Sequence, residues 1–272
     1  MNKTAFIAAF SFLTFIACQQ KNGSTDNTAA TDSIALNTET TAPVAADTFP
    51  VKRIELIDSI SPKTGFDLSD PEIGPENLHY SFAADWPTDN SILADSIRAW
   101  IISNMGDKYN NETSDIEKLF HLYAQDFYKE TERWNGCTTE INISKAYEND
   151  KIVTYTADSY YYLGGAHGGG FYSGTSFCKE TGKILGWSIF KSPQEIKDKI
   201  LEKMPEYFDV KTTEEALEMM ILNDTFPLPT TEPWIINDSI FFIYQSYEIA
   251  CYAAGRPNCV FAMDELKDYL KK

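Results

Sequence analysis

Residues Thr138–Cys178 have the sequence TTEINISKAYENDKIVTYTADSYYYLGGAHGGGFYSGTSFC, and this stretch sets the expected architecture. It holds runs rich in β-branched and aromatic residues at Thr138–Tyr147, Lys151–Leu163 and Phe171–Cys178. A polar tripeptide separates the first two runs and a glycine-rich segment separates the last two, as turns separate neighbouring strands. The stretch therefore predicts an antiparallel meander.

Strand and helix patterns extend from this meander in both directions. We expect further strands at Val51–Ile60, Leu78–Ala84, Trp234–Ile236, Ser239–Ile249 and Val260–Ala262. We expect helices that begin at Asn90 or Ser91, at a Ser114–Glu117 capping box and at a Ser192–Glu195 capping box, and helices over Thr212–Leu222 and Asp264–Leu270. Strands in clusters, with helices between the clusters, indicate the α+β class: antiparallel meander sheets packed with helices.

The first residues have the pattern of a bacterial lipoprotein signal. Met1–Ala17 has one early cation, Lys3, and then an apolar run that is too short to span a bilayer. Small or apolar residues precede Cys18, as in the lipobox, where the cysteine is lipidated and becomes the mature N-terminus. We therefore expect residues 1–17 to be a signal peptide and Cys18 to carry the membrane anchor.

Composition divides the rest of the chain. Residues 18–48 are rich in Thr, Ala, Asn and Asp, and they cannot bury enough apolar area to fold, so we expect a flexible tether. Residues 49–130 are expected to form a smaller α+β subdomain, and residues 131–272 a larger C-terminal domain. The two are expected to associate.

The charge restricts the possible partners. The chain has 23 Lys and Arg against 40 Asp and Glu, a formal net charge of −17. Such a field repels nucleic acid and attracts basic proteins, so we expect no nucleic-acid partner. Apart from the lipid on Cys18, no membrane contact is expected. Gln19 is not the aspartate that retains lipoproteins in the inner membrane, so we expect the outer membrane of the cell envelope, with the protein facing the periplasm.

Four cysteines follow Cys18. An envelope compartment permits disulfides, and Cys251 and Cys259 flank a Gly-Arg-Pro-Asn turn, which favours a bridge between them. Cys137 and Cys178 would then form a second pair. Neither pair has zinc-site spacing and the three histidines lie far apart, so we expect no metal and no cofactor.

Two segments resemble a known family. Tyr160–Gly168 (YYYLGGAHG) and Tyr244–Gly255 (YQSYEIACYAAG) resemble the hallmark stretches of the domain shared by the RsiV anti-sigma factor and the accessory region of the PdaC peptidoglycan deacetylase. The resemblance covers roughly Thr138–Leu270, and Phe49–Lys129 is similar to the smaller N-terminal half of that family. This sequence departs from the family at Cys251, where proline is usual.

The resemblance implies the function class. The chain shows neither a sigma-binding segment nor the metal-binding motifs of a deacetylase, so RsiV-like transcriptional control and PdaC-like catalysis are not carried over. What remains is the extracytoplasmic module, which in RsiV is a lysozyme receptor. We therefore expect a non-enzymatic lipoprotein that binds a ligand such as lysozyme or cell-wall glycan. The alternatives are a peptidoglycan-modifying enzyme centred on His167 and a structural or assembly lipoprotein.

The glycine-rich loop supplies most of the candidate ligand contacts, which are Tyr161, Gly165, His167 and Tyr172. A histidine on such a loop could act as a general base, but it could equally bond a backbone carbonyl in a tight strand connection. We assign no catalytic residue. The tyrosines suit recognition of a protein or glycan if they are exposed, or they form a second packed face.

The second hallmark segment adds Glu248 and Tyr252. Strand alternation would place Glu248 on the face opposite to Tyr247 and Ile249, and a buried carboxylate there needs a backbone amide or Arg256 as partner. Convergence of the Gly164–Gly170 loop with the Tyr252–Asn258 loop would favour a ligand site.

Overall fold

A computed structural model describes residues 48–60, 78–106, 108–109, 112–131, 136–222 and 225–271. The expected signal peptide, the lipidation site Cys18 and all of the expected tether except its last residue lie outside these ranges. Among the helices in the described ranges, none combines the length and the apolar character needed to cross a membrane.

The described residues form both helices and strands, and the predicted α+β class is confirmed. The strands are β1 (Val51–Ile60), β2 (Leu78–Pro87), β3 (Thr138–Glu148), β4 (Ile152–Tyr162), β5 (Gly169–Cys178), β6 (Trp234–Ile236), β7 (Ser239–Ile243) and β8 (Asn258–Ala262). The helices are α1 (Ile92–Met105), α2 (Ile116–Thr131), α3 (Pro193–Tyr207) and α4 (Thr213–Glu218), with short 3₁₀ turns η1 (Gly186–Ile189), η2 (Tyr252–Ala254) and η3 (Met263–Leu266).

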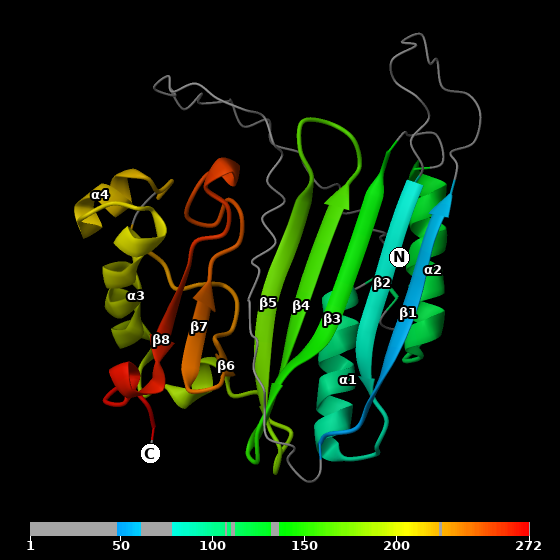
Figure 1. The fold of residues 1–272 in the computed structure, drawn as a ribbon, viewed down its shortest axis with the longest axis horizontal. Helices are drawn as coiled ribbons and strands as arrows, with labels where there is room; N and C mark the ends of the chain where they lie inside the picture. Colours follow the sequence, from blue (N-terminus) through cyan, green and yellow to red (C-terminus); the bar gives the residue numbers. More distant parts are fainter. Residues whose placement is uncertain are drawn as a thin grey trace, which may run out of the picture. The chain divides into compact units, whose positions relative to one another are not determined.

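The first sheet has five strands in the order β1-β2-β3-β4-β5 (Figure 1). Strands β3, β4 and β5 pair antiparallel, as the meander pattern predicts. Strands β2 and β3 pair in parallel, and the chain crosses between them through α1 and α2. The sheet therefore continues across residue 130, where the sequence pattern places a subdomain boundary.

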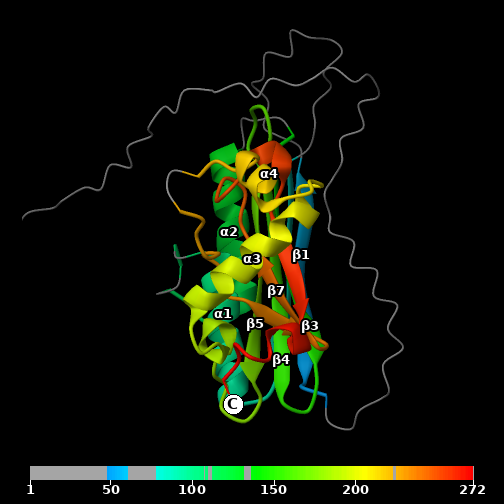
Figure 2. The same ribbon diagram turned by 90° about the vertical axis from the view of Figure 1, so that its left-hand side faces the viewer.

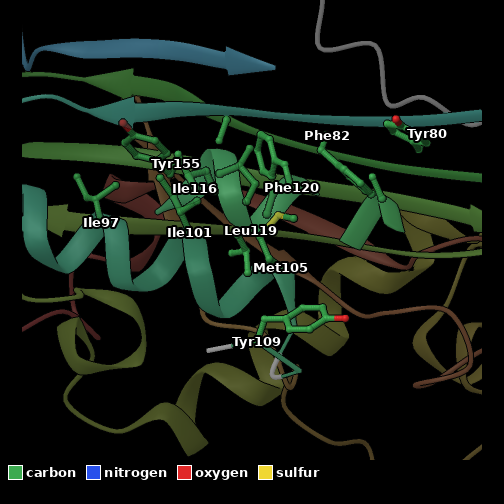
Figure 3. Packing of buried hydrophobic residues seen from close by; sticks show 14 of the residues in the cluster. Tyr80, Phe82, Ile97, Ile101, Met105, Tyr109, Ile116, Leu119, Phe120 and Tyr155 are labelled. Atoms are coloured by element: carbon green, nitrogen blue, oxygen red, sulfur yellow. The ribbon is translucent and has the colours of Figure 1, made fainter. Parts of the chain in front are cut away.

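Helices α1 and α2 cover one face of this sheet (Figures 1 and 2). The spacing of α1 turns Ile97 and Ile101 inward, and both are fully buried. They pack with Phe120 of α2 and with Phe82 and Tyr155 of the sheet (Figure 3). Because successive strand residues alternate between the two faces, the other face of the sheet is left for different partners.

The helix starts follow the sequence closely. Ser91 caps α1, because its hydroxyl accepts a hydrogen bond from the amide of Ala94 at 3.1 Å. At α2 the cap is Asp115, one residue later than the capping-box pattern predicts, and its carboxylate accepts from the amide of Glu117 at 3.0 Å. At α3 Ser192 occupies the N-cap position, but its side chain makes no capping bond.

The second sheet has three strands in the order β6-β7-β8, with α3 and α4 packed beside it (Figures 1 and 2). Its core includes Phe242, Ile196 and Met204. Three predicted elements are shorter than the patterns indicate. Strand β7 ends at Ile243, α4 ends at Glu218, and the last predicted helix is only the 3₁₀ turn η3.

The two sheets are joined through the face of the first sheet that α1 and α2 do not cover. The hydroxyl of Thr154 donates to the carbonyl of Ile235 at 2.6 Å, and the amide of Ile235 donates to the hydroxyl of Ser176 at 2.8 Å. Trp234 lies flat against Gly174, where no Cβ stands in the way. Buried hydroxyl bonds and one indole ring thus hold β6 to β4 and β5.

Both predicted disulfides are wrong for this structure, in which Cys137, Cys178, Cys251 and Cys259 are free thiols. Cys137 precedes the first residue of β3, whereas Cys178 lies level with the opposite end of that strand, roughly 36 Å away at about 3.3 Å per residue. Cys259 faces the second core from β8, where burial raises the pKa of its thiol to about 12. Sequence spacing does not reveal which way a strand residue faces.

Glu148, at the end of β3, fastens the first described residues of the chain to the sheet. Its carboxylate accepts from the amide of Phe49 at 2.7 Å, from Lys145 at 2.9 Å and from Lys179 at 2.5 Å. Burial alone would raise the pKa of Glu148, but these three donors outweigh it and hold the pKa below its usual value.

We expect Glu148→Gln to destabilise the fold by about 1–3 kcal/mol near neutral pH, because two lysines and an amide lose a charged acceptor. A carboxyl with a lowered pKa stabilises the fold above its unfolded pKa of about 4.3, and this contribution disappears as the pH falls through the folded value. Urea unfolding from pH 7 to pH 3 should therefore show the difference from wild type shrinking below about pH 4. The exposed Glu180→Gln is the control. A difference that persists unchanged at pH 3 would contradict the assignment.

Candidate functional site

The glycine-rich loop between β4 and β5 meets the segment between β7 and β8. The ring of His167 stacks on the ring of Tyr252, with centroids 3.9 Å apart and planes 17° apart. The hydroxyl of Tyr247 lies 3.3 Å from Nε2 of His167. We call His167, Tyr247 and Tyr252 the His167 cluster. The convergence that would favour a ligand site is therefore present.

The hydrogen bonds of His167 define its tautomer. Nδ1 lies 2.8 Å from the carbonyl oxygen of Gly168, which can only accept, so Nδ1 carries the proton. Nε2 is then free to accept the hydroxyl proton of Tyr247. The imidazole is thus fixed by its own loop, and His167 is exposed.

The loop glycines let two tyrosine rings lie on opposite sides of the strand ends. A Cβ on Gly168 would stand 2.6 Å from the hydroxyl of Tyr160, and a Cβ on Gly169 would stand 2.5 Å from the hydroxyl of Tyr161. By alternation, Tyr160 shares the face of the His167 cluster, and Tyr161 stands on the face covered by α1. The structure therefore places Tyr161 apart from the other candidates.

Gly165 is the turn residue of this loop. Its φ of +99° favours glycine, and an added Cβ would meet nothing within 4 Å. The hydroxyl of Tyr162 donates to its carbonyl at 3.0 Å. Gly165 thus shapes the loop, and the space where a side chain would stand is open to solvent.

Glu248 has a structural role. One carboxylate oxygen accepts from the amide of Thr230 and the other from the amide of Gln245, both at 2.7 Å. Of the two predicted partners, backbone amide or Arg256, the amides are the ones found. The predicted strand face of Glu248 is wrong, because β7 ends at Ile243 and the chain turns back under this carboxylate.

Tyr247 was not among the sequence candidates, yet it is the most unusual residue of the site. Its φ is +68°, a left-handed conformation that a bulky side chain adopts at a cost of about 1–3 kcal/mol. The side chain is nevertheless 55% exposed. The surrounding turn holds Tyr247 in this strained state, which is typical of functional positions. The sequence signal, a tyrosine flanked by Ser246 and Glu248, does not reveal the turn.

Tyr172 belongs to the joint between the sheets and lies beside the His167 cluster. Its amide donates to the side-chain oxygen of Gln245 at 3.1 Å, and its carbonyl accepts from the Gln245 amide nitrogen at 2.8 Å. Its ring packs on Trp234, and burial raises the pKa of its hydroxyl. The side chain of Gln245 thus closes the outer edge of β5 as a neighbouring strand would.

A charged contact fastens the two loops. Nη1 of Arg256 lies 3.7 Å from the carboxylate of Asp158 on β4. Its guanidinium also approaches Gly170, where a Cβ would come within 2.8 Å of Nη2. Arg256 therefore ties the η2 segment to the sheet below the His167 cluster. Within the described residues, no group of three His, Cys, Asp or Glu side chains is arranged to hold a metal ion.

These elements also correspond to known proteins. Residues 188–262 match the DUF3298 family model, described as a protein of unknown function. This segment contains α3, α4 and the second sheet, including Tyr247 and Tyr252. No curated protein gives a significant match to the sequence.

Solved structures share the fold over most of the chain. A DUF3298 family member from Bacteroides fragilis superposes with a TM-score of 0.62 at 18% identity, covering 82% of this chain and 94% of the other. A DUF3298 family protein from Pseudomonas aeruginosa gives a TM-score of 0.59 at 14% identity, covering 82% and 95%. At these identities the similarity shows the fold, and it extends well beyond the segment matched by the family model.

Proposed function

We propose that this protein is a non-enzymatic lipoprotein of the bacterial cell envelope that binds a basic protein through the His167 cluster. The observation that supports it is the stacked pair of His167 and Tyr252 beside the strained, exposed Tyr247. Exposed aromatic side chains on a fixed backbone supply large contact area at low entropic cost, and such residues dominate protein interfaces.

The charge of the chain supports the choice of partner. A formal net charge of −17 attracts cationic proteins over long distances and accelerates their association. The resemblance to RsiV makes lysozyme the first protein to test. The lipobox pattern at Cys18 supports anchoring outside the cytoplasm, and the outer membrane with a periplasmic orientation remains our proposal.

The alternative of an enzyme centred on His167 has less support. The ring nitrogens of His167 are engaged by a backbone carbonyl and a tyrosine hydroxyl. A general base needs an orienting acid or a nucleophile within hydrogen-bond reach. A structural or assembly lipoprotein would use the same surface to bind another component of the envelope. This alternative therefore differs from our proposal in the identity of the partner.

We expect Tyr247→Ala to weaken lysozyme binding by about 30-fold or more, as loss of an interface hot spot of about 2 kcal/mol does. The chain from residue 19 onward is suitable, because it keeps the compact unit Ala42–Lys272. Binding is measured by biolayer interferometry at low and physiological salt, and the association rate should fall as salt rises.

Tyr161→Ala is the matched control, since Tyr161 is 51% exposed but lies on the other face. Absence of binding at both salt concentrations would exclude the basic-protein partner. Equal losses for Tyr247→Ala and Tyr161→Ala would exclude the His167 cluster as the site. Wall-digesting activity that disappears in His167→Ala would favour the enzyme instead.

A further inference from the structure

We propose that a groove along α1, on the face of the sheet opposite to the His167 cluster, binds an oligosaccharide of uncharged or anionic sugars. The groove consists of two adjoining depressions of about 370 Å³ and about 710 Å³, which share Ser103. Both volumes lie in the range of about 300–1,000 Å³ that small-molecule sites occupy. This inference stands independently of the proposed function.

One wall of the groove is a stripe of α1. Ser96, Ala99, Trp100 and Ser103 are spaced so that they share one side of the helix. The stripe borders the apolar side of the helix that packs on the sheet, and apart from Trp100 its side chains are small. Small side chains leave the space beside the helix open, and the half-buried Trp100, whose ring also packs against Tyr155 and Phe177, lines this space.

The floor and the far wall provide further aromatic rings and hydroxyls. Tyr161 and Phe171 line the smaller depression, and they are 51% and 38% exposed. Ser188 and Thr181 line the larger one. Pyranose rings stack on aromatic faces, and their hydroxyls bond to side-chain oxygens and amides. The hydroxyl of Ser103 donates to the carbonyl of Trp100, so its acceptor lone pairs remain available.

The groove differs in charge from the rest of this acidic chain. Among the described residues that line it, Glu140 is the one carboxylate, and its place in β3 puts it on the other face, 3.9 Å from His79. Lys183 adds a cation to the larger depression. In a chain with 40 acidic residues, a groove whose one lining carboxylate belongs to the other face of the sheet favours a neutral or anionic ligand over a cationic one.

The neighbouring strand edge does not favour a peptide as occupant. Extended peptides commonly bind by adding a strand to a free sheet edge. On β5 the backbone amide and carbonyl of Tyr172 both bond to the side chain of Gln245. Further along the strand, the carbonyl of Ser176 accepts from the amide of Leu185 at 2.9 Å, and the amide of Cys178 donates to the carbonyl of Lys183 at 2.9 Å. These positions are occupied within the chain itself.

The test is titration of the chain from residue 19 with an oligomer of N-acetylglucosamine, followed by amide chemical shifts and calorimetry. We expect saturable shifts at Ser96–Gly106 and at Phe171. Tyr161→Ala should weaken the affinity by about tenfold, and Ser103→Glu, which adds bulk and negative charge where the depressions join, should abolish binding. Tyr161 is exposed, so its removal should leave the fold intact.

Tyr247→Ala is the matched control and should bind the oligosaccharide as wild type does. Saturable oligosaccharide binding that is lost in Tyr247→Ala but kept in Tyr161→Ala would overturn the groove assignment. The assignment would also be overturned if the wild-type protein bound no oligosaccharide at millimolar concentration. Preferential binding of an unstructured peptide to the groove would overturn it as well. The lysozyme experiment can fail without affecting this result, because the residues it assigns to protein binding, Tyr247 and His167, lie on the other face and line neither depression.

Discussion

Gly174→Val is expected to destabilise the protein by about 3 kcal/mol, the upper part of the range for overpacking a filled interior. A Cβ at Gly174 would stand 2.4 Å from the ring atoms Cγ and Cδ2 of Trp234. The indole has no free space to move into, because it is 3% exposed and stacks on Phe241 at 5.6 Å. Urea unfolding followed by circular dichroism measures the loss.

A double-mutant cycle separates this steric overlap from other effects. Trp234→Ala removes the ring that the valine would meet. The loss of stability in the double variant should therefore be smaller than the sum of the two single losses by about 1–3 kcal/mol. Gly165→Ala is the comparison glycine, because its added Cβ meets nothing within 4 Å and its cost is that of a φ of +99°. If Gly174→Val were as stable as the wild type, the packing of Trp234 against Gly174 would be contradicted.

Phe242→Ala should be more damaging, with an expected loss of about 3–5 kcal/mol. Phe242 is 1% exposed in the middle strand of the second sheet. Its ring lies 5.6 Å from that of Trp187, 6.0 Å from Phe190 and 5.9 Å from Phe261. Since whole domains are stable by about 5–15 kcal/mol, this single cavity removes a large share of the total.

The matched control is Val260→Ala on β8, the strand that pairs with β7. Val260 is 40% exposed, so its truncation should change stability by less than about 0.5 kcal/mol. Fluorescence of Trp187 is a local reporter, because its indole borders the cavity. Equal losses for Phe242→Ala and Val260→Ala would contradict the packing of the second core.

The local parts of the fold were predictable from sequence. Alternation at Thr138–Cys178 gives the meander, and the serine before an apolar helical stripe gives the start of α1 at Ser91. These signals are local, because the side chains that form them lie within a few residues of one another. The parallel pairing of β2 with β3 has no such signal, since the strands are separated by α1 and α2.

The end of β7 shows where local patterns mislead. Ser239–Ile249 alternates like one strand, but the strand ends at Ile243. Beyond it, Gln245 pairs with Tyr172 and Glu248 binds two backbone amides. Tyr172 and Thr230 come from other segments of the chain, and only the amide of Gln245 is local to Glu248. These hydrogen bonds outweigh the preference of the alternating residues for a strand.

The sequence alone identified the glycine-rich loop, His167 and Tyr252 as candidates. Only the tertiary structure decided that Tyr252 stacks on His167, that Tyr247 joins them and that Tyr161 lies on another face. Tyr247 and His167 are 80 residues apart. Contacts over such separations depend on how the two sheets pack together, which local sequence preferences do not encode.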